Sequence, residues 1–172
     1  LYGDVPFISS STIKKMMEEK NIGADIVIAG FKAQHPGAYG RIVLENEKII
    51  KIIEAKDATK DELENNLCNS GIILSNSRNL HDLTKLLKNE NAKEEFYLTD
   101  IIEIANNQGQ ICSLVLCPEM ETLGVNTRIE LSKAETLFQK AAREKCMDNG
   151  VTLASPENTI FSLDTHIGRD TW

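Results

Sequence analysis

The chain has 172 residues, enough for one full domain or for a large part of one with an appendage. Hydrophobic residues make up 41% and charged residues 26%, the ordinary balance of a globular protein. The formal net charge of -7 argues against a broadly basic surface, so we expect neither nucleic acid nor an anionic membrane as a partner.

Cysteine usage and hydropathy favour a cytoplasmic protein. The four cysteines form no CxxC pair, which indicates buried free thiols instead of disulfides or a zinc site. No run is long and apolar enough to cross a membrane, and no signal peptide is evident. The sequence opens at Leu1 inside what resembles a motif already under way, so we expect a piece of a longer protein.

Helical and strand patterns alternate in the first part of the chain. The serines at 9–11 offer an N-cap for a helix that ends near Gly23, and the apolar run 24–31 predicts a buried strand. Residues 41–44 and 48–53 predict a hairpin, and 68–74 predict a further strand after a charged loop with a short helix.

The second part continues this alternation. Leucines at positions 80, 83, 86 and 87 predict an amphipathic helix with a core-facing stripe, and Thr99 and Asp100 are placed to begin the next helix. A strand at 111–116 precedes a long helix that follows Asn126 and runs to about Met147. Its expected inward residues are Leu131, Ala134, Leu137, Phe138 and Ala141. This order predicts an α/β fold with a mixed, mainly parallel sheet.

Two residues far apart in the sequence suit a magnesium ion. Asp4 follows Gly3 and precedes Pro6, so its carboxylate stands in an extended or turn segment where a nucleotide phosphate could approach. Asn126 precedes the long helix, where its side chain is either an N-cap or a second oxygen ligand. From these residues alone, an ordinary loop aspartate and a capping asparagine remain the simpler interpretation.

Four further residues suit a sugar and its phosphate. Gly40 ends a glycine-flanked tyrosine segment where the backbone can approach a ligand, and Glu54 ends an apolar strand where its carboxylate can accept from sugar hydroxyls. Lys56 could meet a phosphate, and the Asn69 amide could read a hydroxyl or an acetamido group. A hairpin entrance, a solvated strand end and a turn explain the same residues without a ligand.

Six segments in this order resemble one enzyme family, the bacterial bifunctional UDP-N-acetylglucosamine pyrophosphorylase/glucosamine-1-phosphate N-acetyltransferase. The resemblance covers essentially the whole chain. The segments are Leu1-Tyr2-Gly3-Asp4-Val5-Pro6, Gly37-Ala38-Tyr39-Gly40-Arg41-Ile42, Ile53-Glu54-Ala55-Lys56-Asp57-Ala58, Asn69-Ser70-Gly71-Ile72, Glu95-Phe96-Tyr97-Leu98-Thr99-Asp100 and Gly124-Val125-Asn126.

The resemblance implies a Rossmann-like uridyltransferase that joins UTP to N-acetylglucosamine 1-phosphate and releases pyrophosphate, forming UDP-N-acetylglucosamine. It implies Mg²⁺ as the cofactor, bound by Asp4 and Asn126, and nucleotide-sugar contacts at Tyr2 and Gly3. It also implies that two groups of residues surround the sugar: Gly40, Glu54 and Asn69 around the ring, and Tyr97 and Thr99 near its acetamido group.

The resemblance divides the chain into three parts. Residues 1–126 would be a uridyltransferase domain without its N-terminal part, and 127–150 a long linking helix. Residues 151–172, rich in short β-prone pieces, would begin the family's left-handed parallel β-helix. In the full-length parent that domain is trimeric and acetylates glucosamine 1-phosphate with acetyl-CoA, so acetyl-CoA and the homotrimer are expected of the parent only.

The resemblance also implies what this chain lacks. The family's glycine-rich loop, catalytic arginine and lysine, and uracil-reading segments belong upstream of Leu1, so we expect no catalytic residue here and little activity from this chain alone. Ser70 and Thr127 differ from the residues common in the family. Two alternatives stay open: a related hexose-1-phosphate nucleotidyltransferase, and a non-catalytic module that binds sugar nucleotides.

Overall fold

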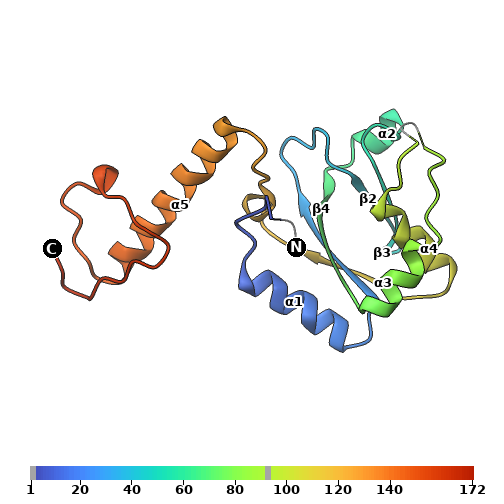
Figure 1. The fold of residues 1–172 in the computed structure, drawn as a ribbon, viewed down its shortest axis with the longest axis horizontal. Coiled ribbons are helices and arrows are strands. Elements are labelled where there is room, and N and C mark those ends of the chain that lie inside the picture. The colour runs from blue at the N-terminus through green and yellow to red at the C-terminus, as the bar shows by residue number, and fades with distance from the viewer. Residues whose placement is uncertain (1–2, 92–93) are drawn as a thin grey trace. The chain divides into compact units, whose positions relative to one another are not determined.

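The computed structural model describes residues 3–91 and 94–172, which form two compact units. The first, Leu1–Leu123, contains the β-sheet and is called the sheet unit here. The second, Gly124–Trp172, is built on the long helix α5 (Arg128–Asp148) and is called the helix unit (Figure 1).

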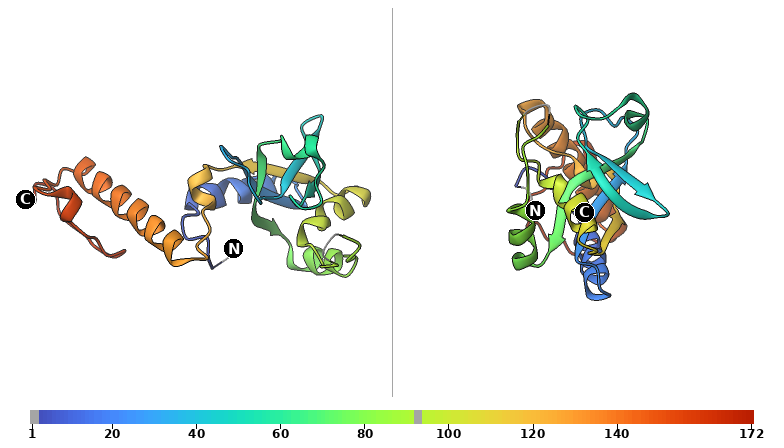
Figure 2. Two further views of the ribbon diagram at one scale, coloured as in Figure 1. Left: turned by 90° about the horizontal axis from the view of Figure 1, so that it is seen from above. Right: turned by 90° about the vertical axis from the view of Figure 1, so that its right-hand side faces the viewer.

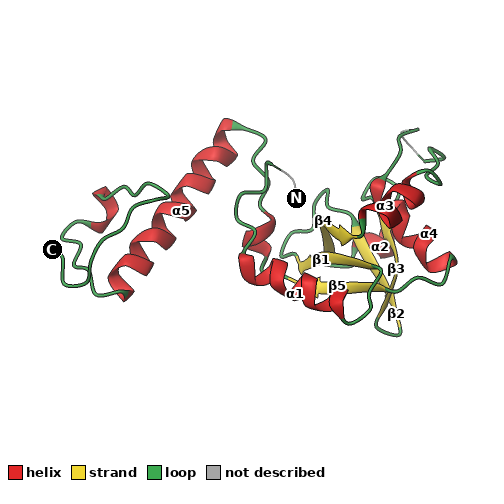
Figure 3. Ribbon diagram, turned by 60° about the horizontal axis from the view of Figure 1, so that its bottom comes forward, coloured by secondary structure: helices red, strands yellow, loops and turns green. Residues whose placement is uncertain are grey.

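The sheet unit contains a five-stranded mixed sheet with the order β3-β2-β4-β1-β5 (Figure 3). Its strands are β1 (Ile26–Lys32), β2 (Arg41–Glu45), β3 (Lys48–Ile53), β4 (Leu67–Ser75) and β5 (Cys112–Leu116). Among the described residues β1 pairs parallel with β5, whereas the pairs β1–β4, β2–β3 and β2–β4 are antiparallel. The α/β class and the mixed sheet are confirmed, but the expectation of mainly parallel pairing is wrong for these strands.

Alternate residues of β1 supply the two cores on either side of the sheet. Val27, Ala29 and Phe31 pack with α1 (Ser10–Asn21), whereas Ile26 and Ile28 pack with α3 (Ser77–Thr84) and α4 (Ile101–Asn107). Figure 1 shows α1 on one side of the strands and α3 and α4 on the other. Burial on both faces explains why β1 is a continuous apolar run.

Two local predictions in this unit are confirmed: the start of the first helix and the hairpin. Ser9 is the N-cap of α1, and its side chain accepts a hydrogen bond from the Thr12 N–H. The hairpin β2–β3 turns at Asn46 and Glu47, both with positive φ, as a tight two-residue turn requires. The short α2 (Lys60–Leu63) begins with a capping box formed by Thr59 and Glu62.

Two local predictions are wrong. The leucine stripe stops early because α3 ends at Thr84, so Leu86 is 49% exposed although Leu83 is buried. Neither Thr99 nor Asp100 caps α4 through its side chain. The chain instead enters α4 through the 3-10 turn η1 (Leu98–Asp100), which leaves the Thr99 hydroxyl free to bond elsewhere.

The helix unit consists of α5 (Arg128–Asp148), the short 3-10 turn η3 (Pro156–Asn158) and connecting segments. Figure 2 shows α5 as one continuous helix. Thr127 is its N-cap, in a capping box with Glu130, so the interpretation of Asn126 as the N-cap is wrong. Of the expected inward residues Ala134 is buried, whereas Leu131 is 47% exposed.

A polar side chain joins α5 to the C-terminal segment within the helix unit. Gln139 donates to the Phe161 carbonyl and accepts from the Phe161 N–H, both at 2.8 Å. Backbone hydrogen bonds from Thr152 to Thr171 and from Asp170 to Gly150 pair the two ends of that segment. No strand is assigned among the described residues 151–172, and the β-helix and the three-part division remain predictions.

The cysteines are free thiols, as predicted, with Cys68 and Cys117 buried. Within the described ranges, none of the helices has the length and apolar composition needed to cross a bilayer.

Candidate functional site

A pocket of about 340 Å³ lies in the sheet unit, where four separate segments meet. These are the entrance to the hairpin, the end of β3, the start of β4 and the segment before α4. The pocket brings together five of the residues predicted from the sequence: Gly40, Glu54, Asn69, Tyr97 and Thr99. The other lining residues stand in the same motifs but were not given a role from the sequence: Ala38, Tyr39, Ser70, Gly71, Phe96 and Leu98.

Gly40 is fixed between the hairpin and β4. Its carbonyl accepts a hydrogen bond of 2.8 Å from the Asn69 N–H. A Cβ at Gly40 would lie 3.1 Å from the Ile52 Cγ2 and 3.6 Å from the Glu54 Oε1, so a side chain there would crowd this part of the pocket.

The Asn69 side chain is held by its own strand. Its Oδ1 accepts from the Gly71 N–H at 3.0 Å in a local turn, and Gly71 has a φ of +82°. The next side chain, Ser70, donates to the Ala29 carbonyl at 2.6 Å and is buried. Because Gly71 engages the oxygen of the Asn69 amide, the Nδ2 group is the part that can donate to a ligand acceptor.

Thr99 fixes the carboxylate of Glu54. The Thr99 hydroxyl donates to the Glu54 Oε1 at 3.0 Å, and Thr99 is only 8% exposed. The neighbouring Asp100 has a raised pKa, mainly because it is partly buried and further because Glu103, Glu54 and Asp57 are close. This corner of the pocket is therefore acidic, which suits hydroxyl donors of a sugar and opposes a phosphate. Lys56 is exposed and does not line the pocket, so its phosphate contact remains a prediction.

Two aromatic residues of the predicted motifs also line the pocket. The Tyr39 ring packs edge-on against Phe31, with ring centroids 4.9 Å apart, and this contact anchors it to the core of the sheet unit. Tyr97 is partly buried at the N-terminal side of η1. Its proximity to an acetamido group remains a prediction.

The predicted magnesium ligands lie outside this pocket. Asp4 and Gly3 are exposed in the N-terminal turn of the sheet unit, and a Cβ at Gly3 would meet nothing within 4 Å. Tyr2 falls outside the described residues. Asn126 belongs to the helix unit, where its N–H donates to Glu130 at 2.8 Å. A carboxylate and an amide oxygen are donors that Mg²⁺ accepts, so the donor set fits the ion.

Sequence reasoning missed a buried carboxylate that holds the start of α1. The Glu121 Oε2 accepts from the Thr12 hydroxyl at 2.7 Å and from the Ser9 N–H at 3.0 Å. Burial alone would raise the pKa of Glu121, but these hydrogen bonds outweigh it and lower the pKa. The sequence did offer one signal for Glu121: it is an acidic residue between the apolar strand β5 and the Gly124-Val125-Asn126 motif.

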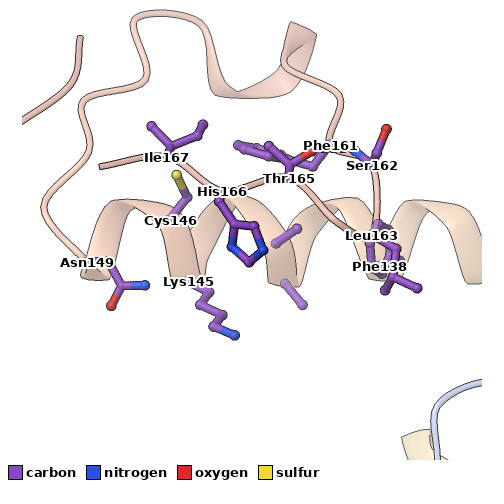
Figure 4. Close-up of a pocket in the computed structure, with 12 residues that line it drawn as sticks. Phe138, Lys145, Cys146, Asn149, Phe161, Ser162, Leu163, Thr165, His166 and Ile167 are labelled. Carbon is purple, nitrogen blue, oxygen red and sulfur yellow. Dashed lines mark hydrogen bonds between the residues drawn. The ribbon is translucent and has the colours of Figure 1, made fainter. Parts of the chain in front are cut away.

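A second pocket, of about 430 Å³, lies within the helix unit between α5 and residues 161–167 (Figure 4). Its lining mixes apolar side chains such as Phe138, Phe161 and Ile167 with Lys145 and His166. None of the predicted site residues contributes to it.

Comparison with known proteins finds relatives that match this chain along nearly its whole length. A scan against protein-family models finds no match. Curated relatives do match, each over almost all of this chain: "Bifunctional protein GlmU" from Dinoroseobacter shibae is 49% identical over 169 residues, or 98% of this chain. The chain matches part of the bifunctional GlmU proteins. GlmU from Paramagnetospirillum magneticum is 46% identical over 172 residues, and GlmU from Roseobacter denitrificans is 44% identical over 171.

The match confirms the family resemblance carried by the six motifs. The chain spans about 38% of the length of these GlmU relatives. Solved structures show the same fold with lower identity. A structure titled a putative glucose-1-phosphate thymidylyltransferase from Bacillus anthracis has a TM-score of 0.54 and 21% identity, over 75% of this chain and 49% of that one. A nucleoside-diphosphate-sugar pyrophosphorylase from Vibrio cholerae has a TM-score of 0.52 and 12% identity, over 73% and 48%.

Proposed function

We propose that this chain is the sugar-binding part of a uridyltransferase, which joins UTP to N-acetylglucosamine 1-phosphate to form UDP-N-acetylglucosamine. The observation that carries the proposal is the pocket of about 340 Å³ that unites Gly40, Glu54, Asn69, Tyr97 and Thr99. The 49% identity to a bifunctional GlmU supports it, because these residues stand in the motifs on which the resemblance was based.

The polar groups of the pocket complement an N-acetylated sugar. Glu54 offers a carboxylate to sugar hydroxyls, and Thr99 restrains its orientation through one oxygen. Asn69 offers amide donors to a hydroxyl or acetamido oxygen, with its own oxygen already engaged by Gly71. Partial enclosure by Phe96 and Tyr97 supplies apolar surface for the acetamido methyl.

The proposed reaction needs orientation more than proton transfer. An oxygen of the sugar phosphate is already ionised, so it attacks the α-phosphorus of UTP without a general base. The new oxygen–phosphorus bond forms as the bond to the β-phosphate oxygen breaks, and pyrophosphate leaves. A pocket that fixes the sugar therefore contributes by aligning its phosphate for in-line attack.

Mg²⁺ is part of this proposal. Asp4 and Asn126 would hold it, because both present hard oxygen donors and because they stand in the first and the last of the six motifs. When bound, the ion supplies charge neutralisation on the nucleotide phosphates. The second activity of the bifunctional parent, its acetyl-CoA substrate, its trimer and its cytoplasmic role in cell-wall precursor synthesis are proposals for the whole protein only.

Calorimetric titration of the 172-residue chain with N-acetylglucosamine 1-phosphate tests the sugar assignment. We expect binding that is tighter than for glucose 1-phosphate. Asn69→Ala should weaken binding by about tenfold, the equivalent of one lost polar contact of ~1.4 kcal/mol. The control is Asn158→Ala, which removes an asparagine that bonds to Ser155 in the helix unit.

Three results would change the proposal. Equal affinity for the two sugar phosphates would favour a related hexose-1-phosphate nucleotidyltransferase. No affinity for either would remove the sugar-binding role. Robust UDP-N-acetylglucosamine synthesis by the chain alone would contradict the expectation that it needs groups outside these 172 residues.

A further inference from the structure

We propose that Arg41 is a positioning residue for the sugar pocket: its buried guanidinium holds the hairpin-entrance loop, residues 37–40, in the one conformation that forms a pocket wall. This inference rests on the proposed function of the pocket. It concerns a side chain that does not line the pocket and is not expected to touch the sugar.

Arg41 is buried at the start of β2. It is 2% exposed, and its backbone faces Ile53 of β3 on one side and Cys68 of β4 on the other. From this position the side chain turns back on the loop that precedes it. Its Nη1 donates to the Tyr39 carbonyl, and its Nη2 donates to the Gly37 carbonyl at 3.1 Å.

The environment of Arg41 is unusual for a buried charge. No ion pair within the described ranges includes it, and its buried Nε has no hydrogen-bond partner there. A buried cation without a carboxylate partner is not expected to stabilise the fold, because an apolar residue of similar volume commonly gives equal or greater stability. The fork of two N–H groups on two carbonyls of one loop is instead a geometric restraint that few other side chains can supply.

The loop so restrained is the wall that carries Ala38, Tyr39 and Gly40. Two backbone hydrogen bonds also restrain this loop: the Tyr39 N–H donates to the Pro36 carbonyl at 3.1 Å, and the Gly40 carbonyl accepts from the Asn69 N–H. Gly37 has a φ of +45°, a backbone conformation that glycine adopts readily, so the loop can bend and present its carbonyls to the guanidinium. Without the guanidinium, the carbonyls of Gly37 and Tyr39 would lose these donors and be free to turn, which would loosen the pocket wall next to Gly40.

The test compares Arg41→Lys and Arg41→Met with the unsubstituted 172-residue chain. Lysine keeps the charge, but one ammonium cannot reproduce the planar fork. Two quantities are measured: hydrogen exchange at the amides of residues 38–40, and the affinity for UDP-N-acetylglucosamine. We expect both variants to exchange faster at these amides and to bind at least about tenfold more weakly, while amides of α5 are unchanged.

Two controls separate positioning from general stability. Arg143→Lys alters another arginine that donates to a backbone carbonyl, that of Thr159 in the helix unit, and should leave the affinity unchanged. Ile49→Val trims a buried core residue of the sheet unit away from the pocket and provides a destabilised variant with the loop intact.

The outcomes are distinct. The proposal is overturned if Arg41→Lys leaves loop exchange and affinity unchanged, or if Ile49→Val at equal loss of stability weakens binding as much. If the unsubstituted chain does not bind UDP-N-acetylglucosamine, the proposed function fails, while the exchange rates of residues 38–40 still decide whether Arg41 holds the loop.

Discussion

The hydrogen bond between Thr99 and Glu54 provides a direct test of how the pocket is organised. Thr99→Val keeps the shape of the side chain and removes only the hydroxyl that donates to the Glu54 Oε1 at 3.0 Å. Although Thr99 is only 8% exposed, valine has nearly the same shape, so no large rearrangement is needed to accommodate it. Glu54 would then keep its charge but lose the group that sets its orientation.

The expected magnitude follows from the partner and its exposure. A hydrogen bond to a charged group contributes about 1.5–3 kcal/mol when buried. Glu54 is only partly buried, so water replaces part of the lost partner, and we expect the free energy of unfolding to fall by about 1 kcal/mol. An unfixed carboxylate should weaken UDP-N-acetylglucosamine binding by about tenfold, which corresponds to ~1.4 kcal/mol.

The assay is urea denaturation together with calorimetric titration. Thr122→Val is the matched control, because Thr122 is 3% exposed and its hydroxyl donates to the Glu119 carbonyl at 2.8 Å away from the pocket. Both variants should lose a similar amount of stability, and only Thr99→Val should lose affinity. Unchanged affinity in Thr99→Val, or an equal loss in Thr122→Val, would refute the assigned role of the Thr99–Glu54 pair.

Three further predictions concern residues outside the pocket. The pKa of Glu121 is lowered in the folded state, so the ionised carboxylate stabilises the fold above the pKa of an unfolded glutamate, about 4.3, and this stabilisation is lost as pH falls through the folded value. We therefore expect the free energy of unfolding of Glu121→Gln, measured by urea denaturation, to depend less on pH below about 5 than that of the unsubstituted chain. Burial raises the pKa of Cys112 and Cys117 to about 11, so iodoacetamide at pH 8 should modify these thiols slowly until the chain unfolds. Mass spectrometry measures the labelling, and rapid labelling of the native chain would contradict the burial of these thiols. Gln139→Leu leaves the N–H and C=O of Phe161 without their partner, so the unfolding free energy of the helix unit should fall by about 2–4 kcal/mol. Hydrogen exchange at the Phe161 amide measures this loss, and native-like protection there would count against the two Gln139 hydrogen bonds.

Local chemistry made much of the sheet unit predictable. The serine before α1 and the turn residues of the β2–β3 hairpin act over a few residues, so the sequence reports them directly. The residues of the sugar pocket could also be identified from the sequence, because each of them lies in a short motif. Their meeting in one pocket depended on the family resemblance, since nothing local shows that Gly40 and Thr99 approach the same Glu54.

Long-range pairing and burial explain what could not be predicted. An apolar run such as β4 looks the same whether it pairs parallel or antiparallel, so the strand directions were misjudged. Thr99 and Asn126 both precede helices, but the chain enters α4 through η1, and the capping box of α5 uses Thr127. Arg41 was not singled out because arginine is rarely buried, and only the folded loop reveals its two carbonyl partners.

Titration of the isotope-labelled 172-residue chain with UDP-N-acetylglucosamine, followed by amide chemical shifts, tests the sugar-binding pocket most directly. The account predicts that the largest shifts occur at Gly40, Asn69, Gly71 and Thr99, and that they shrink together in Asn69→Ala. Shifts confined to the helix unit, or a chain that shows none at saturating ligand, would contradict it.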